Sequence, residues 1–211
     1  LHELRDRLNS ARPFSFPNRS PKVAFVFPGQ GSQTIAMCAA LYESEPVFRD
    51  AFDRCSLVLV PLLGFDIRDV VFPEQHSEAK DEKILLSTST QQPVLFTVSW
   101  SLCELLAKFG VKAETYIGHS VGEFVAAVRA GSMSVETALR ILVARGAAIQ
   151  SCEPGQMISV STDSATLTSF LPYGVDIAAV NAPNAIVASG PENAIDLLSN
   201  SLREEGIKHV K

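Results

Sequence analysis

The sequence has few of the residues that mark a disulfide framework, a metal site or a nucleic-acid surface. Among 211 residues there are four cysteines and four histidines. Cys38, Cys55, Cys103 and Cys152 lie far apart without a CxxC pair, so neither a zinc site nor a redox pair is indicated, and we expect mostly buried, reduced thiols in a cytoplasmic protein. The net charge of -5, without a basic cluster, argues against nucleic acid as a partner.

Long hydrophobic runs are also missing. No stretch reaches the roughly 18 continuous apolar residues of a membrane span. Residues 94–111 come nearest, but Glu104 and Lys108 interrupt them. The first ten residues are charged and unlike a secretory signal. With 46% apolar and 19% charged residues, the composition is typical of a globular domain, and we expect neither a membrane nor a nucleic acid among its partners.

The most informative feature present is the run Gly-His-Ser-Val-Gly at residues 118–122. Residues 114–117 before it are β-prone, and residues 121–130 after it carry apolar side chains at helical spacing. This order is typical of a nucleophile elbow, in which a sharp turn lifts the hydroxyl of Ser120 to the amino end of a helix, where an oxyanion is favoured. A chance match to the short pattern is the alternative.

A second glycine turn, Pro-Gly-Gln-Gly-Ser-Gln, occupies residues 28–33. The uninterrupted apolar run at residues 23–27 before it predicts a buried parallel strand. By itself the turn could be an ordinary strand-to-helix loop or a weak phosphate loop, although it lacks the lysine and the glycine spacing of nucleotide-binding loops. Beside a nucleophile elbow, it indicates backbone N–H groups that approach a ligand.

The rest of the chain alternates strand-like runs with amphipathic helices, which predicts an α/β fold with a parallel sheet. We expect helices at residues 46–59, 92–109 and 134–149, and a polar surface loop at residues 73–82. After a change of composition near residues 152–155, strands are expected at 157–161, 175–180, 185–189 and from 208, and helices at 164–171 and 192–205. That β-α-β-β-α-β order predicts a ferredoxin-like unit.

Together these motifs resemble the malonyl-CoA:acyl carrier protein transacylases and, more closely, the acyltransferase domains of modular polyketide synthases and fatty acid synthases. The resemblance runs from about Lys22 to the end and is carried by residues 27–33, 41–48, 92–96, 118–122 and 180–184 and by Arg145. It implies a hydrolase-like parallel-sheet core with an inserted ferredoxin-like α+β subdomain, and an active site in the cleft between them.

The same resemblance divides the chain into three segments. Residues 1–21, which begin with Leu and contain three prolines, would be the tail of a linker from an upstream ketosynthase domain. Residues 22–154 would form the large α/β acyltransferase subdomain, in incomplete form. Residues 155–211 would form the small ferredoxin-like subdomain. The implied partners are therefore an acyl carrier protein and the adjacent ketosynthase.

The implied chemistry is a ping-pong transfer in polyketide or fatty acid biosynthesis. Ser120 would attack the thioester of malonyl-CoA, and the phosphopantetheine thiol of the carrier protein would then take up the acyl group. The backbone N–H groups of Val121 and Gln30 would hold the oxyanion. Gln92 would help to order the site, or would only cap the following helix. We expect no bound cofactor beyond these thioester substrates.

Arg145 is expected in a helix of otherwise mostly apolar residues, where a guanidinium is unfavourable unless it meets an anion. The resemblance assigns it a two-pronged contact with the free carboxylate of a malonyl-type substrate, a geometry that suits guanidinium. The alternative is an arginine on the helix surface. The residue after the nucleophile often differs with substrate in the family, and Val121 favours malonyl over methylmalonyl.

Two further residues complete the candidate site. His119 is expected to support the site by a hydrogen bond rather than to act as the base, because it is held on the other side of the elbow from Ser120. Asn181 matches a family residue near the cleft, or only forms a turn. The family's catalytic histidine belongs to a motif that would follow Lys211, so we expect this chain to be impaired. A serine esterase or thioesterase, and a non-catalytic structural fragment of a synthase, remain as alternative functions.

Overall fold

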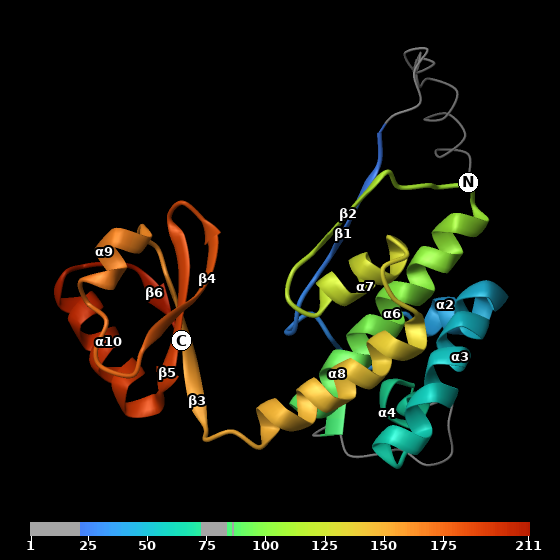
Figure 1. Ribbon diagram of the computed structural model, residues 1–211, viewed down its shortest axis with the longest axis horizontal. Helices are drawn as coiled ribbons and strands as arrows, with labels where there is room; N and C mark the ends of the chain where they lie inside the picture. The colour runs from blue at the N-terminus through green and yellow to red at the C-terminus, as the bar shows by residue number, and fades with distance from the viewer. Residues whose placement is uncertain (1–21, 73–83, 86) are drawn as a thin grey trace, which may run out of the picture. The chain divides into compact units, whose positions relative to one another are not determined.

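The computed structural model describes residues 22–72, 84–85 and 87–211, and both the expected linker at residues 1–21 and the expected loop at residues 73–82 lie outside them. The chain divides into two compact units, Leu1–Gln150 and Ser151–Lys211, which are described separately (Figure 1). Both combine helices with sheet, as the predicted α/β fold with a ferredoxin-like part requires.

The first unit contains a pair of parallel strands. β1 (Ala24–Phe27) pairs in register with β2 (Thr115–Gly118), so that Phe27 lies opposite Gly118. The helices of this unit are α2 (Ala39–Ser44), α3 (Pro46–Leu63), α4 (Ile67–Val71), α6 (Thr88–Lys108), α7 (Gly122–Arg129) and α8 (Val135–Gln150). Because parallel strands present their carboxyl ends at the same edge, the turns that follow β1 and β2 leave the sheet side by side.

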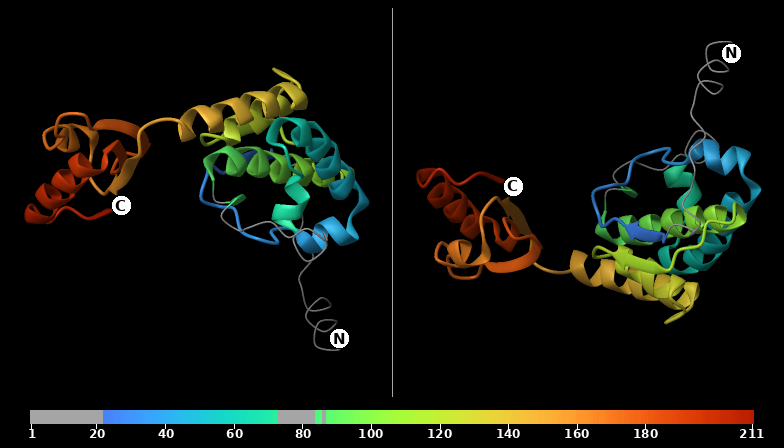
Figure 2. Two further views of the ribbon diagram at one scale, coloured as in Figure 1. Left: turned by 90° about the horizontal axis from the view of Figure 1, so that it is seen from below. Right: turned by 90° about the horizontal axis from the view of Figure 1, so that it is seen from above.

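The long helices α3, α6 and α8 pack against one another and contribute much of the core of this unit (Figure 2). Pro46 starts α3, where its missing N–H is not needed, and Gly64 ends it with φ 79°. Phe48 and Phe52 of α3 and Phe96 of α6 are fully buried in the core of this unit. A Cβ on Gly146 would lie 2.7 Å from the Cα of Ser89, so glycine is what allows α8 to approach α6.

The prediction that residues 23–27 form a buried parallel strand was wrong about burial. The strand forms and is parallel, but only Phe27 is buried, and Val26 is 71% exposed. Helices of this chain cover one face of the β1–β2 pair, whereas side chains on the other face, such as Val26 and Ile117, remain open. Apolar side chains favour burial, but those on one face of a strand are buried only where another layer of the protein covers that face.

The second unit has the ferredoxin-like topology that the sequence predicts. Its elements are β3 (Gly155–Val160), α9 (Ser164–Thr168), β4 (Asp176–Ala182), β5 (Ala185–Pro191), α10 (Glu192–Glu204) and β6 (His209–Val210). The strands form an antiparallel sheet in the order β4-β5-β3-β6. Ile158, Ile186 and Ala188 of the sheet pack against Ile195 and Leu198 of α10 in a core of its own.

The cysteines are free, but they are buried less uniformly than expected. Cys55 and Cys103 are buried, Cys38 is half-buried and Cys152 is exposed. Burial raises the pKa of Cys55 to about 12 and that of Cys103 to about 11, which keeps both thiols protonated and unreactive.

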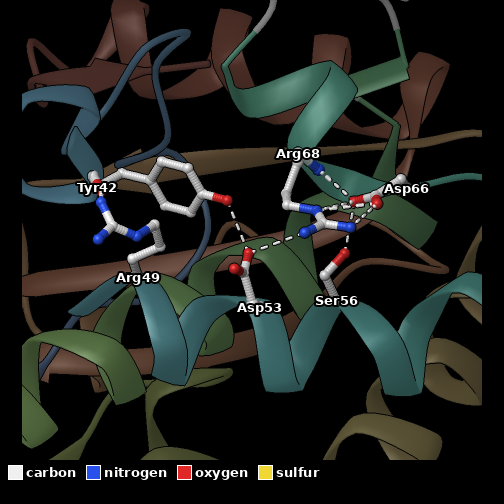
Figure 3. A network of polar contacts seen from close by, with 6 residues as sticks. All are labelled: Tyr42, Arg49, Asp53, Ser56, Asp66 and Arg68. Carbon is white, nitrogen blue, oxygen red and sulfur yellow. Dashed lines mark hydrogen bonds and ion pairs between the residues drawn. The ribbon is translucent and has the colours of Figure 1, made fainter. Parts of the chain in front are cut away.

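A polar network joins α2, α3 and α4 (Figure 3). The guanidinium of Arg68 donates from Nε to both carboxylate oxygens of Asp66 (3.0 and 2.9 Å) and from Nη1 to Asp53 (3.0 Å), which also accepts from the hydroxyl of Tyr42 (2.7 Å). Ser56 donates to Asp66 from α3. Burial by itself raises the pKa of Asp66, but the hydrogen bonds from Arg68 and Ser56 outweigh burial and hold that pKa at about 2.

We expect Asp66→Asn to weaken the acid dependence of stability. The carboxylate stabilises the fold above its unfolded pKa of about 3.9, and this contribution is lost as the pH falls through the folded pKa of about 2. Between about pH 5 and pH 2, the wild type should lose on the order of 1 to 2 kcal/mol of unfolding free energy that the variant does not lose, after allowing for solvent around the partly exposed pair.

Urea unfolding followed by circular dichroism at the two pH values measures this difference. Asparagine can still accept from the Arg68 N–H at the start of α4, so helix capping is retained. Exposed Asp50→Asn on α3 removes one carboxylate away from Arg68 and is the matched control. If the unfolding free energy of Asp66→Asn fell with pH as much as that of the wild type, the lowered pKa of Asp66 would not be the source of the acid dependence.

Candidate active site

Ser120 lies in a tight turn between β2 and α7. Its φ of 52° is in the left-handed region, which costs a residue with a side chain about 1–3 kcal/mol and persists only where the surroundings impose it. The surroundings are close backbone contacts. A Cβ on Gly118 would lie 2.1 Å from the nitrogen of Glu123, and one on Gly122 would lie 2.3 Å from the carbonyl oxygen of Phe27. The two glycines of the pattern are therefore required by close approach, and the strained backbone is that of the serine itself.

The start of α7 leaves one N–H group next to the serine. The N–H groups of Gly122, Glu123 and Phe124 donate to the carbonyls of residues 119, 120 and 121 in successive turns (3.0–3.1 Å). That of Val121 donates no hydrogen bond within the described part of the chain. An unpaired N–H at the amino end of a helix, beside a nucleophile, is suited to bind an oxyanion.

The first glycine turn lies against this elbow. The N–H of His119 donates to the carbonyl of Phe27 (3.0 Å), and a Cβ on Gly29 would lie 2.7 Å from Nδ1 of His119. Glycine at residue 29 thus makes room for the imidazole. No hydrogen bond joins His119 to Ser120 among the described residues, and the ring lies against Gly29 of the glycine turn.

Side-chain amides connect the glycine turn to two helices. Nη1 of Arg145 on α8 donates to Oε1 of Gln92 on α6 (2.6 Å). Nε2 of Gln92 donates to Oε1 of Gln30 (3.4 Å), and Nε2 of Gln30 donates to Oε1 of Gln91 (3.0 Å). The structure therefore brings Gln30, Gln92 and Arg145 together, as separate stretches of sequence could not show. Gln92 is fully buried and is the centre of this chain of contacts.

The positions of Gln92 and Arg145 bear on the alternatives that the sequence left open for each of them. Gln92 does not cap its helix, because α6 begins four residues earlier at Thr88, after Ser87. Arg145 is only partly buried, and its neighbours Ile141 and Ile149 are 41% and 42% exposed. Arg145 is thus not enclosed by apolar side chains, and the neutral oxygen of Gln92 accepts a hydrogen bond from its guanidinium. Its contact with a substrate carboxylate stays a prediction.

The remaining candidate, Asn181, belongs to the second unit, whereas the residues described above belong to the first. It is an exposed residue within β4, and the turn that follows is formed by Pro183 and Asn184. The interpretation of Asn181 as a turn former was therefore wrong, since the strand continues to Ala182. A role near the active site stays a prediction.

Sequence reasoning missed Gln91 and the side chain of Gln30. It used only the backbone N–H of Gln30, whereas the side-chain amide is the group that reaches α6. The available signal was the pair of adjacent glutamines at residues 91 and 92, which a helix directs about 100° apart. Only the position of the glycine turn beside α6 shows that both can reach Gln30.

Other features of the described residues indicate no second centre. No group of three or more His, Cys, Asp or Glu side chains within these ranges could hold a metal ion. A mainly apolar cavity of about 420 Å³ lies between β1, the glycine turn and α6, against Val26, Leu95 and Leu102, and Ser120 is not in its lining. No helix in the described ranges combines the length and apolar character needed to cross a membrane.

Residues 24–211 match the acyl transferase domain family. The mycoketide-CoA synthase of Mycobacterium tuberculosis is 39% identical over 186 residues, which are 88% of this chain and 4% of that protein. Erythronolide synthase EryA2 of Saccharopolyspora erythraea is 35% identical over 190 residues, which are 88% of this chain and 5% of that protein. The chain thus spans a small part of these much longer relatives.

Solved structures agree in fold. The acyl transferase domain of SpnD, in complex with 2-(pent-4-yn-1-yl)malonyl, superposes with a TM-score of 0.83 at 34% identity, covering 97% of this chain and 48% of that one. The malonyl CoA-acyl carrier protein transacylase of Clostridium perfringens has a TM-score of 0.78 at 26% identity, covering 90% and 60%. By sequence and by fold, the chain belongs to the acyl transferase domain family, in the form found in modular polyketide synthases.

Proposed function

We propose that this domain transfers a malonyl-type unit from CoA to the phosphopantetheine thiol of an acyl carrier protein, through an ester on Ser120, in the cytoplasm. The observation that carries the proposal is the chain of hydrogen bonds from Arg145 through Gln92 to Gln30. It links a group that can bind a carboxylate to the turn that can bind an oxyanion.

Two displacements would make up the reaction. Oγ of Ser120 bonds to the thioester carbon, the bond from that carbon to the sulfur of CoA breaks, and the proton of Oγ passes through a general base to the leaving thiolate. The pantetheine sulfur then bonds to the ester carbon, the bond from that carbon to Oγ breaks, and the thiol proton passes through the general base to Oγ of Ser120. The N–H groups of Val121 and Gln30 would stabilise both tetrahedral intermediates, and no described side chain hydrogen bonds to Oγ as its base.

Arg145 supports a dicarboxylic substrate over a simple fatty acyl one. A guanidinium can donate two parallel hydrogen bonds to a carboxylate. Nη1 is held by Gln92, and the side chain remains partly exposed, so its other donors are accessible to a ligand. A serine esterase would have no use for this arrangement, and no observation favours that alternative.

Intact-mass analysis of the longest polypeptide that carries this chain, during exposure to malonyl-CoA, tests the proposal. A stable malonyl adduct on Ser120 that is discharged only by an acyl carrier protein is the expected result. Rapid release of CoA without a carrier would identify an esterase instead. Absence of any adduct would contradict the proposed function and would leave a docking or structural role beside the ketosynthase.

A further inference from the structure

The hydrogen bonds between Arg145, Gln92, Gln30 and Gln91 run in one direction. A guanidinium has donors and no acceptor, so the group that Gln92 turns toward Arg145 has to be its oxygen. The NH2 group of Gln92 then faces the oxygen of Gln30. The NH2 group of Gln30 in turn faces Gln91, which has to supply an acceptor. The orientation that Arg145 imposes on Gln92 is therefore matched by those of Gln30 and Gln91.

Gln30 has few other attachments. Hydrogen bonds within the glycine turn join Gly31 to Gln33 (2.9 Å) and Ser32 to Gly29 (3.1 Å), and they hold the turn together without fixing it to the protein. The exposed side chain of Gln30 reaches α6 through the contacts to residues 91 and 92. Of the two, the contact to Gln91 is shorter, at 3.0 Å against 3.4 Å.

We infer that Gln91 is a positioning residue for acyl transfer, acting through Gln30. By accepting from the NH2 group of Gln30, its Oε1 anchors the glycine turn to α6 and so holds the backbone N–H of Gln30 where the oxyanion forms. This inference rests on the proposed function. A small displacement of such a donor weakens it greatly, because its effect depends on prior alignment.

Identical substitutions at adjacent positions test the direction of the contacts. Gln91→Glu keeps an acceptor for Gln30, so the rate of acyl loading should stay within about threefold of wild type. Gln92→Glu can still accept from Arg145 but cannot donate to Gln30, and it places a carboxylate on the guanidinium. Loading of malonyl should therefore fall by more than about tenfold, and loading of acetyl should fall less. Gln91→Met, of similar size but without a strong acceptor, should lower the loading rate about tenfold.

Comparing the loading of malonyl-CoA with that of acetyl-CoA distinguishes a positioning role of Gln91 from structural damage. Gln91→Met should lower the maximal loading rate for malonyl-CoA and acetyl-CoA by the same factor, with KM, the malonyl-to-acetyl preference and Tm unchanged, because both substrates share the oxyanion site. A wild-type rate in Gln91→Met, an equal loss in Gln91→Glu and Gln91→Met, or a changed preference would each overturn the inference.

A second measurement does not depend on activity. In this chain without substrate, the side-chain NH2 resonances of Gln30 should keep their hydrogen-bonded shifts in Gln91→Glu and move toward solvent values in Gln91→Met. Unchanged resonances in Gln91→Met would refute the contact. If the wild type failed to load malonyl while these resonances changed as expected, the proposed function would fail and the anchoring of Gln30 by Gln91 would stand.

Discussion

Replacing Ser120 with alanine is expected to abolish covalent acyl loading while the fold stays intact. Alanine also carries a Cβ, so it can adopt the φ of 52° at about the same cost as serine. The close contacts of Gly118 and Gly122 are then preserved, and only the hydroxyl is removed. Without a nucleophile no acyl ester can form, so the adduct should disappear entirely rather than form slowly. Intact mass after exposure to malonyl-CoA, with Tm measured in parallel, tests this in the longest polypeptide that carries the chain.

Ser132→Ala supplies a matched control for that experiment. Ser132 is an exposed residue in the segment between α7 and α8, so its removal tests a serine outside the elbow. Loading in this variant should equal that of the wild type. Undiminished labelling of Ser120→Ala would show that another residue carries the acyl group, and the assignment of the elbow would have to be withdrawn.

Replacing Arg145 with alanine is expected to change the preference for malonyl over acetyl, and this is the second large effect. If Arg145 binds the malonyl carboxylate, its loss leaves that anion unpaired at a cost on the order of 2 to 5 kcal/mol, and the partial exposure of Arg145 places the effect toward the lower value. Loading of malonyl should then fall about thirtyfold or more. Acetyl lacks the carboxylate and should lose far less.

The ratio of the malonyl loading rate to the acetyl loading rate is the decisive quantity, because Arg145 also donates a hydrogen bond to Gln92. Removing it also frees Gln92, so a small loss common to both substrates is expected through Gln30. Arg140→Ala is the control on the same helix, since Arg140 is 59% exposed and pairs with Glu136 (2.9 Å). If malonyl and acetyl loading fell by one common factor in Arg145→Ala, Arg145 would be structural and the dicarboxylate proposal would be wrong.

Much of the fold could be predicted because its signals are local. The apolar spacing of residues 121–130, the glycines around Ser120 and the alternation beyond residue 154 act within one turn or one strand, and the corresponding elements formed close to the expected bounds. The helices α2 and α4, of six and five residues, were missed, since helices this short carry only a weak periodic signal.

The sequence by itself determined the strand-turn-helix form of the elbow and the order of elements, because periodicity and turn chemistry operate between near neighbours. Only the tertiary structure decided that Val26 is exposed and that Gln30 meets Gln91 across 61 residues. It also decided that Arg145 meets Gln92 across 53 residues. A hydrogen bond between distant polar side chains leaves no repeat in the sequence, and its partners are selected by how strands and helices pack.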